Sequence, residues 1–586
     1  MKVIWVCVLV SVLIGCGGGA DSNGPGQPTS SINPTTPSSN PSTSSPSSPT
    51  VTPTSQSDNS TVPSTTPNNA ARLLTQATFG PTKTEIDAVV NMGIETWIEQ
   101  QFVVQQSNHR AMTLAIFNAD DNARIDNSAE LPWSGHRYAA WSEIALHGKD
   151  QLRQRVAFAL SQLFVVSDKS ALDNSHLGLA TYYDGLAEHA FGNYRDLLEF
   201  VTLSPSMGVY LNMLSNEKPD ESNNIRPDEN FAREVMQLFT IGLEELNLDG
   251  SLKMHDGQPI PTYDINTVKA YAHVFTGWNF YGTTYETWDN WWQNRNFRNQ
   301  MVLIPEYHAQ NVRKNLLNNV VVEAGTDGET AMQMALDSLF EHPNVGPFVA
   351  RHLIQRLVTS NPSPAFIART AQVFNDNGAG VRGDLGAVIK HILLDEEARY
   401  EIASQPLGYG KVKEPLIRGI QMIRAFGIYE PNTPKPQWYD YPFNQSPLSS
   451  PSVFNFFSDT FTPSGELDDM DLVAPELEII NDTYMVRNSN HAAWWSMWTP
   501  STVEIDRGDE RAMTIDFTPY IGMLQDDPEQ FLDYLDLVLL SGSMNDAMRQ
   551  AILDYDHVAK SWLSDLERVK EMVFMVTGSP QFAVQR

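Results

Sequence analysis

Polar residues that could do acid–base or anion-binding chemistry recur along the segment 230–242. Asn230, Glu234 and Gln237 are spaced i, i+4 and i+7, which places them on one face of a helix, and Arg233 lies beside Glu234. A carboxylate can act as a general acid or base or bind a metal, and a guanidinium can hold an anion. We therefore take Glu234 and Arg233 as candidate catalytic residues, with Asn230 and Gln237 as candidate ligand contacts.

The same segment also has a purely structural interpretation. Phe231, Val235 and Leu238 form an apolar stripe that faces the core, so the polar residues lie at a boundary. There, an Arg–Glu ion pair could brace the turn-rich stretches on either side of the helix. The sequence leaves both interpretations open.

Two histidines, His273 and His308, have aromatic rather than charged neighbours. We expect His308 to join Glu234 and Arg233 in one cleft, with Trp278 in its wall. With Glu234 and Asp264, the two histidines could also bind zinc, manganese or iron. The alternative is a pair of hydrogen-bonded core histidines, and the sequence identifies neither a metal nor a cofactor.

Aromatic side chains are dense between residues 280 and 292, where Trp288, Trp291 and Trp292 lie among Asn, Asp and Gln. Exposed rings beside amides and acids are suited to stacking on and hydrogen bonding to sugars. These tryptophans are therefore candidate carbohydrate contacts. The alternative is that the rings anchor loops in the core.

The elements that must position these residues are mostly helices. Apolar residues recur at helical spacing in 152–163, 346–358, 365–374, 385–399, 413–426, 531–540 and 566–577. Strand patterns are short: Asp249-Gly250 suggests a hairpin turn within 246–252, and Val320–Val322 is a β-branched run. The sequence therefore predicts a mainly α fold, a large multi-helix body with one or two small β-hairpins. Turn-rich stretches at 215–230, 280–318 and 428–470 should fold over the helices.

The N-terminus has the pattern of an exported protein. Lys2 precedes an apolar run, Val3 to Ile14, which suits a signal peptide and is too short to cross a bilayer. The run ends in Leu13-Ile14-Gly15-Cys16, which resembles a bacterial lipobox. That resemblance implies a signal peptide over residues 1–15, lipidation of Cys16 and a membrane-anchored protein of the cell envelope. Gly17 after the cysteine favours the outer membrane.

Residues 16–69 follow as a linker. Positions 17–69 hold 34 Ser, Thr or Pro residues and no aromatic residue, so they have nothing to bury against a core. The sequence predicts a disordered tether that holds a globular body, residues 70–586, away from the membrane.

Charge and cysteine content exclude several classes of function. Lys and Arg total 39 against 70 Asp and Glu, a net charge of −31. Such a surface repels phosphate backbones, so we expect no nucleic-acid partner. The two cysteines, Cys7 and Cys16, both lie in the predicted leader and anchor. They exclude a disulfide framework and a cysteine-rich metal site in the body.

The body resembles one bacterial family, domain of unknown function 1800. The resemblance is carried by an ordered set of segments: Ala71-Arg72-Leu73-Leu74-Thr75-Gln76-Ala77-Thr78-Phe79-Gly80, Leu152-Arg153-Gln154-Arg155, Asn230 to Gly242, Phe275-Thr276-Gly277-Trp278, Pro305-Glu306-Tyr307-His308, Lys413-Glu414-Pro415 and Pro451-Ser452-Val453-Phe454. Together with Ser579-Pro580-Gln581-Phe582 they cover nearly all of 70–586. The resemblance implies an exported, mostly helical bacterial protein and supplies no reaction.

These observations favour a cell-envelope lipoprotein that binds or organises envelope or extracellular polymers, carbohydrate among them. The alternative is a hydrolase that acts on a polysaccharide or another polymer through a cleft containing Glu234, Arg233 and His308.

Overall fold

The computed structural model describes residues 65–120, 131–400, 404–427, 440–498 and 515–586. Residues 62–586 form one compact unit. The predicted signal peptide, Cys16 and most of the predicted linker lie outside the described residues. The first helix, α1 (Pro67–Ala77), begins at Pro67, because Thr66 accepts a hydrogen bond from the Asn69 N–H and caps it.

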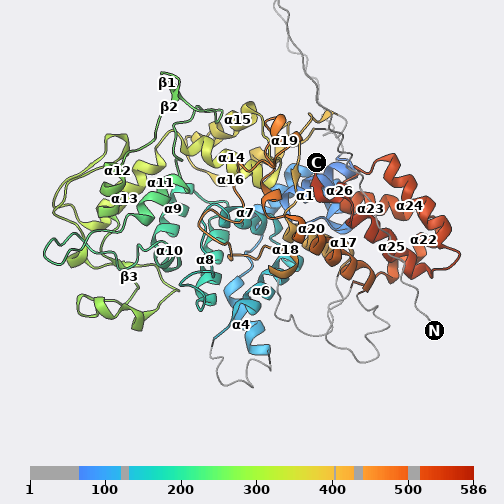
Figure 1. Cartoon of the computed structure of the whole chain (residues 1–586), viewed down its shortest axis with the longest axis horizontal. Helices are drawn as coiled ribbons and strands as arrows, with labels where there is room; N and C mark the ends of the chain where they lie inside the picture. The colour runs from blue at the N-terminus through green and yellow to red at the C-terminus, as the bar shows by residue number, and fades with distance from the viewer. Residues whose placement is uncertain (1–64, 121–130, 401–403, 428–439, 499–514) are drawn as a thin grey trace, which may run out of the picture. The chain divides into compact units, whose positions relative to one another are not determined.

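All the predicted apolar stripes form helices, so the mainly α fold class is confirmed (Figure 1). They correspond to α7 (Gln151–Ser161), α14 (Val345–Leu357), α15 (Pro364–Asn375), α16 (Leu385–Leu394), α17 (Pro415–Phe426), α23 (Pro528–Leu535) with the π-helical turn η7 (Asp536–Leu540), and α25 (Asp565–Thr577). Local signals set several of the helix starts. For example, Ser363 caps α15 through the Phe366 N–H, and Pro364 occupies the first turn.

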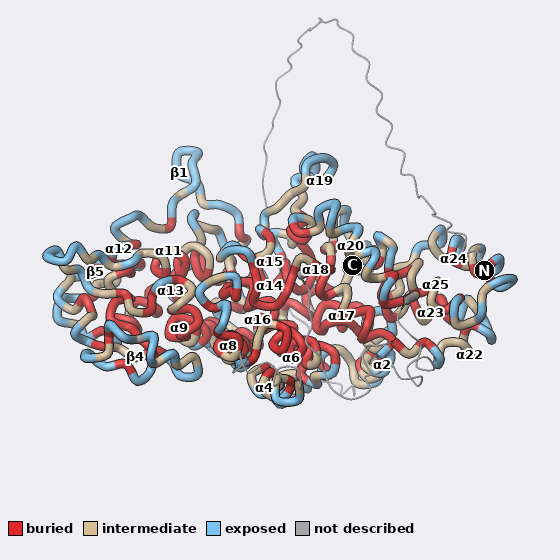
Figure 2. The backbone as a smooth tube through the Cα atoms, turned by 60° about the horizontal axis from the view of Figure 1, so that its bottom comes forward, coloured by how far each residue is buried: buried red, intermediate tan, exposed pale blue. Residues whose placement is uncertain are grey.

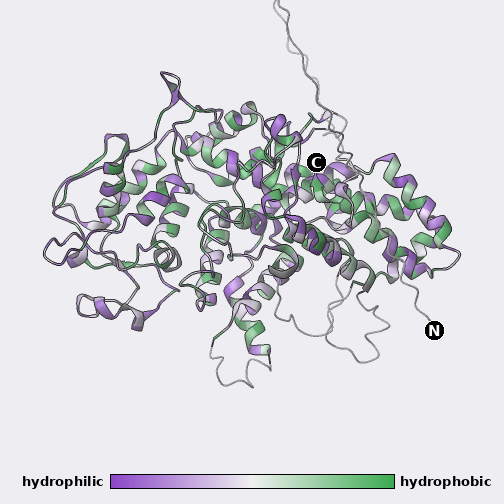
Figure 3. Cartoon of the chain, in the orientation of Figure 1, coloured by the Kyte–Doolittle hydropathy of each residue, from purple (hydrophilic) through white to green (hydrophobic). Residues whose placement is uncertain are grey.

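The core is helix packed on helix. Leu152, Val156 and Leu160 of α7 are almost completely buried, and α14 packs against α15 and α7. Figure 2 shows the buried residues concentrated along α6 (Ser134–His147), α14, α16 and α17. The C-terminal helices α24 (Asp546–Ala559) and α25 are amphipathic, with hydrophilic and hydrophobic faces (Figure 3). Within the described ranges no helix has both the length and the apolar character that a membrane span requires.

Strands are short and antiparallel. The predicted hairpin around Asp249-Gly250 is present as a single bridge, Leu246 to Leu252. The predicted run at 320–322 supplies β6 (Val321–Val322), which pairs with β5 (Lys314–Asn315). The other pairs, which the sequence analysis did not predict, are β1 (Met254–His255) with β2 (Gln258–Pro259), β3 (Trp278–Asn279) with β4 (Val302–Leu303), and β7 (Lys411–Val412) with β8 (Val584–Gln585).

The turn-rich stretch 280–318 folds over the helices, as expected. Residues 280–301 join β3 to β4 and contain the 3₁₀ helix η1 (Tyr285–Asn294). The Met301 N–H donates to the Leu203 carbonyl, and Phe297 packs so closely on Gly178 that a Cβ there would lie 2.7 Å from the ring. Gly178 belongs to α8 (His176–Glu188), so this loop is fixed against the start of α8.

Candidate functional site

The predicted catalytic helix exists as α11 (Asn230–Gln237), and its apolar stripe faces the core as expected. Arg233 forms an ion pair with Glu229, one helical turn earlier, at 3.2 Å. The ion pair is therefore Arg233–Glu229 rather than Arg233–Glu234, and both of its side chains are partly exposed. Asn230 is half-buried, and its N–H donates to the Asp228 carboxylate at 2.7 Å. Gln237 is half-buried at the last turn of the helix.

Glu234 is buried without a strong partner. The Glu234 residue is 7% exposed, and its Oε2 has no hydrogen bond in the described part of the chain. Burial raises the pKa of Glu234, and the nearby Arg233 lowers it only in part. Tyr210 and Tyr263 are close enough for its charge to raise their pKa values. The arrangement is a desolvated carboxyl beside two phenols.

His308 is a core histidine bound to the backbone. Its Nδ1 donates to the Thr276 carbonyl at 3.0 Å, and its Nε2 is buried with no partner among the described residues. Burial lowers the pKa of His308, as do the neighbouring side chains of Lys314 and His273. The charged groups that act on it most are Lys314, Asp327 and His273, none of which belongs to α11.

The predicted metal site does not form in the described part of the chain. Those residues contain no group of three His, Asp, Glu or Cys side chains arranged to hold an ion. Asp264 caps α12 (Ile265–Val274) instead, accepting the Thr267 N–H at 2.8 Å. Helix capping therefore accounts for the position of the Asp264 carboxylate.

Two of the four candidate tryptophans, Trp278 and Trp288, are buried, which for Trp288 corrects the expectation of an exposed stacking ring. Trp278 is 4% exposed. Trp288 is 1% exposed, stacks on Tyr307 with centroids 4.0 Å apart and donates to Glu217 at 2.8 Å. Large apolar rings gain more from burial than from exposure, so they hold the 280–301 loop in place. Trp292 is 54% exposed, and the side chain of Trp291 lies outside the described residues.

The raised pKa of Glu234 leads to a first prediction about stability. Because its folded-state pKa is raised, the protonated form favours folding, and that stability is lost as pH rises through the folded pKa. Glu234→Gln removes this loss, so we expect the variant to be at least as stable as the parent at about pH 7.5 and to lose its advantage near pH 4. Urea unfolding at both pH values measures this. A loss of about 2–4 kcal/mol near pH 7.5 would contradict it and identify a structural ion pair.

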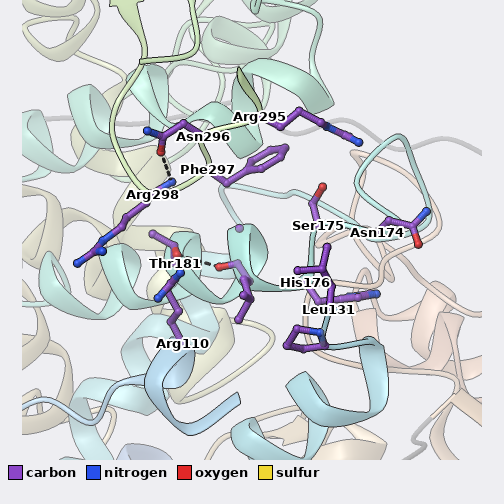
Figure 4. Close-up of a pocket in the computed structure, with 13 residues that line it drawn as sticks. Arg110, Leu131, Asn174, Ser175, His176, Thr181, Arg295, Asn296, Phe297 and Arg298 are labelled. Carbon is purple, nitrogen blue, oxygen red and sulfur yellow. Dashed lines mark hydrogen bonds between the residues drawn. The ribbon is translucent and has the colours of Figure 1, made fainter. Parts of the chain in front are cut away.

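A different group of residues lines a pocket of about 430 Å³ (Figure 4). We call it the arginine pocket. Arg110 comes from α4 (His109–Ala119), and Arg295, Phe297 and Arg298 come from the loop after η1. Its other lining residues include Leu131, Pro132, Asn174, Ser175, His176 and Thr181. Figure 4 shows Arg110 and Arg298 on one side of the pocket and Arg295 and Asn174 on the other.

The three arginines of this pocket differ from other arginines of the described chain in their ion pairs. Across the described ranges, Arg110, Arg295 and Arg298 form no ion pair, although acidic residues outnumber basic ones by 70 to 39. By contrast, Arg195 contacts both Glu199 at 2.8 Å and Asp337 at 2.7 Å. The arginine pocket is therefore a local concentration of positive charge in an acidic chain, and the Asp184 carboxyl, whose pKa burial raises and Arg110 partly lowers, offsets part of that charge.

The backbone adds to this positive character. Helix α8 starts at the pocket, and the Ser175 side chain makes no capping hydrogen bond there. The N–H groups of its first turn and the helix dipole favour a negative ligand. His176 is 7% exposed, and its Nδ1 is buried without a partner among the described residues. Burial, aided by Arg137, lowers the pKa of His176 to about 4, so this ring is neutral at neutral pH.

Local hydrogen bonds fix the loop that carries two of the arginines. The Asn296 side chain accepts the N–H groups of Arg298 and Asn299 at 3.0 and 3.1 Å. Phe297 packs edge to face on Phe280 at 5.1 Å and on Gly178. The pocket can thus hold an anion through guanidinium groups, with an aromatic ring and amides beside it.

The sequence analysis missed this pocket. Arg295 and Arg298 directly follow the aromatic run at 280–292, and that proximity was the one available signal. Arg110 and His176 are more than 100 residues away from them in the sequence, and only tertiary packing brings the segments together.

Comparison with known proteins gives one match. A family model described as "Protein of unknown function (DUF1800)" matches residues 72–584. The comparisons with curated proteins and with solved structures gave no match.

Proposed function

The chain belongs to the family of proteins of unknown function 1800, whose model spans nearly all of its body, and because this membership supplies no reaction, we propose a function from the geometry of the arginine pocket. The protein is a cell-envelope lipoprotein that binds an acidic envelope or extracellular polymer in the arginine pocket. The observation that carries this proposal is the set of three arginines, Arg110, Arg295 and Arg298, that line one pocket and form no ion pair in the described part of the chain.

The overall charge narrows the class of polymer. A net charge of −31 repels dense polyanions, whereas salt screens exposed charges beyond about 8–10 Å, so a local cationic pocket can still bind a single acidic unit. Phe297 and Asn174 add a ring and an amide suited to a sugar. The chemistry therefore fits an acidic polysaccharide that presents a single carboxylate or sulfate group to the pocket better than it fits a nucleic acid.

The hydrolase alternative has less support from the geometry. Arg233 is paired with Glu229, and the charged groups that act most on His308 exclude both Glu234 and Arg233. We therefore assign Glu234, Arg233 and His308 no catalytic role in this proposal.

Anchoring through Cys16 is the second part of the proposal, and the lipobox-like ending supports it. Cys16→Ser should prevent lipid attachment and leave the protein soluble or as precursor, because acyl chains supply the membrane affinity. Fractionation of cells in high salt and carbonate measures this. A Cys16→Ser protein that still sediments with membranes would refute the lipoprotein assignment.

Polymer binding is tested with the full chain on immobilised polysaccharides. We expect retention on uronate-containing or sulfated polymers and none on neutral ones of similar linkage. Raising the salt from about 50 to about 500 mM should release the protein, because the contacts are electrostatic and partly exposed. Comparison of the uronate and sulfate columns identifies the acidic group. Equal retention on neutral polymers would contradict the proposal.

A further inference from the structure

A second pocket, of about 390 Å³, lies between α17, α20 (Asp482–Ala493) and α26 (Pro580–Ala583). These helices lie close together in Figure 1. We call it the Arg418 pocket. Its apolar lining includes Met422, Phe443, Leu477, Ile480, Met485, Trp495 and Phe582. Arg418 is the one permanently charged residue among the described residues that line it.

The Arg418 guanidinium is held in place but not neutralised. Its Nη2 donates to the Asn488 carbonyl oxygen at 3.3 Å, and its Nε is buried without a partner within the described ranges. The Asn488 amide nitrogen donates to the Pro442 and Tyr484 carbonyls at 3.1 and 2.6 Å. These two bonds fix the Asn488 oxygen toward Arg418.

No described carboxylate forms an ion pair with Arg418. Burial alone lowers the pKa of Arg418 to about 10. Lys413 is also buried, and its Nζ donates to Gln421 at 2.7 Å, an uncharged partner. Burial and the nearby Arg418 both lower the pKa of Lys413, so Lys413 offers Arg418 no counter-charge.

Arg424, on the same helix α17, differs from Arg418 in having a carboxylate partner. It is buried, and it donates to both carboxylate oxygens of Glu85 at 2.8 Å. The other N–H groups of its guanidinium donate to backbone carbonyls, among them that of Gly80 at 2.7 Å. Helix α17 thus carries one buried arginine with a carboxylate and one, Arg418, that faces an apolar pocket without a carboxylate in the described part of the protein.

Apart from Arg418, the described residues that line the Arg418 pocket are uncharged at neutral pH, and close packing fixes the position of its wall. A Cβ on Gly419 would lie 2.5 Å from the Phe443 ring, so this glycine allows Phe443 to form the wall. His491 accepts a hydrogen bond from the Trp495 indole N–H at 2.5 Å. Burial lowers the pKa of His491 to about 4, so the imidazole is neutral at neutral pH.

We propose that the Arg418 pocket binds a small carboxylic acid with an apolar body, such as a medium-chain fatty acid. The carboxylate would supply the partner that Arg418 lacks, because an arginine in an apolar site favours bidentate pairing with an acid. The apolar body would pack against Met422, Phe443 and Trp495. This site shares no residue with the arginine pocket, so it stands independently of polymer binding.

The test uses the full chain carrying Cys16→Ser, so that no acyl chain of its own can occupy the pocket. Calorimetric titration with octanoate, octanol and octylammonium varies the head-group charge on one alkyl chain. We expect octanoate to bind at least tenfold more tightly than octanol and octylammonium not to bind. Equal binding of octanoate and octanol, or no binding of octanoate, would overturn the proposal.

A substitution then locates the site. Arg418→Met should lower the octanoate affinity at least tenfold while leaving the octanol affinity within about twofold. The matched control is Arg487→Met, which removes an arginine of α20 that does not line the pocket. If Arg418→Met and Arg487→Met bind octanoate equally well, the carboxylate is not held by Arg418. If Arg418→Met fails to fold, the comparison of octanoate, octanol and octylammonium on the parent chain still tests the proposal.

Discussion

Replacing Arg110 and Arg298 together by alanine is expected to lower the affinity for an acidic trisaccharide at least 100-fold. Each guanidinium that hydrogen-bonds to an anion contributes about 1.5–3 kcal/mol, and each 1.4 kcal/mol is about tenfold in affinity. Both side chains lie on the same side of the arginine pocket (Figure 4), and in our proposal one acidic group contacts both. Calorimetric titration of trigalacturonate into the full chain gives the two dissociation constants.

The control for this prediction removes the same charge elsewhere. Lys83 and Arg313 are surface cations, 46% and 56% exposed, that pair with Asp87 and Glu323. Lys83→Ala with Arg313→Ala should change the affinity less than threefold. Equal losses in the two double variants would mean that only the net charge matters, and the pocket assignment would fail.

The second large effect is on stability. Asp168 and Arg137 form a buried ion pair at 2.6 Å, and Asp168 also accepts the Tyr138 hydroxyl at 3.0 Å. Arg137 further contacts the Pro447 carbonyl, so the pair ties α6 to a distant segment. Asp168→Ala leaves the buried arginine uncompensated and should cost about 3–5 kcal/mol. Chemical denaturation at neutral pH measures this loss.

The pH dependence of stability and a second variant test whether the broken ion pair causes the loss in Asp168→Ala. Burial raises the pKa of Asp168, but Arg137 and the hydroxyls of Ser449 and Tyr138 outweigh it, and the net pKa is lowered. Its stabilisation is therefore present above the unfolded pKa and is lost as pH falls through the folded pKa. The gap between parent and variant should shrink in acid. Arg137→Met combined with Asp168→Ala should recover most of the loss, and a double variant as unstable as Asp168→Ala would contradict this account.

Much of the fold could be predicted because its signals are local. Helix α15 has its cap, its first-turn proline and its apolar stripe within one segment, and the hairpin at 246–252 carries its turn in Asp249-Gly250. Helix α1 shows where composition is less informative, since Pro67 belongs in composition to the linker yet occupies the first turn of the helix.

The site was harder to predict, because its residues are joined only by packing. The i, i+4 spacing on α11 correctly placed Glu234 at a buried boundary, but it gave no information on the partner of Arg233, which is Glu229. Trp288 looked like a sugar contact from its polar neighbours, yet it is buried against Tyr307. Arg110 and Arg298 meet only because the 280–301 loop folds onto α8 beside α4.

The most direct test of the central claim compares trigalacturonate with its methyl ester on the same full chain. The two ligands share the sugar rings and most hydroxyl contacts and differ in charge. Since the arginine pocket is proposed to recognise the acid through unpaired guanidinium groups, trigalacturonate should bind at least tenfold more tightly than the ester at about 50 mM salt. Equal affinity for the acid and the ester, or no binding of either, would contradict the account.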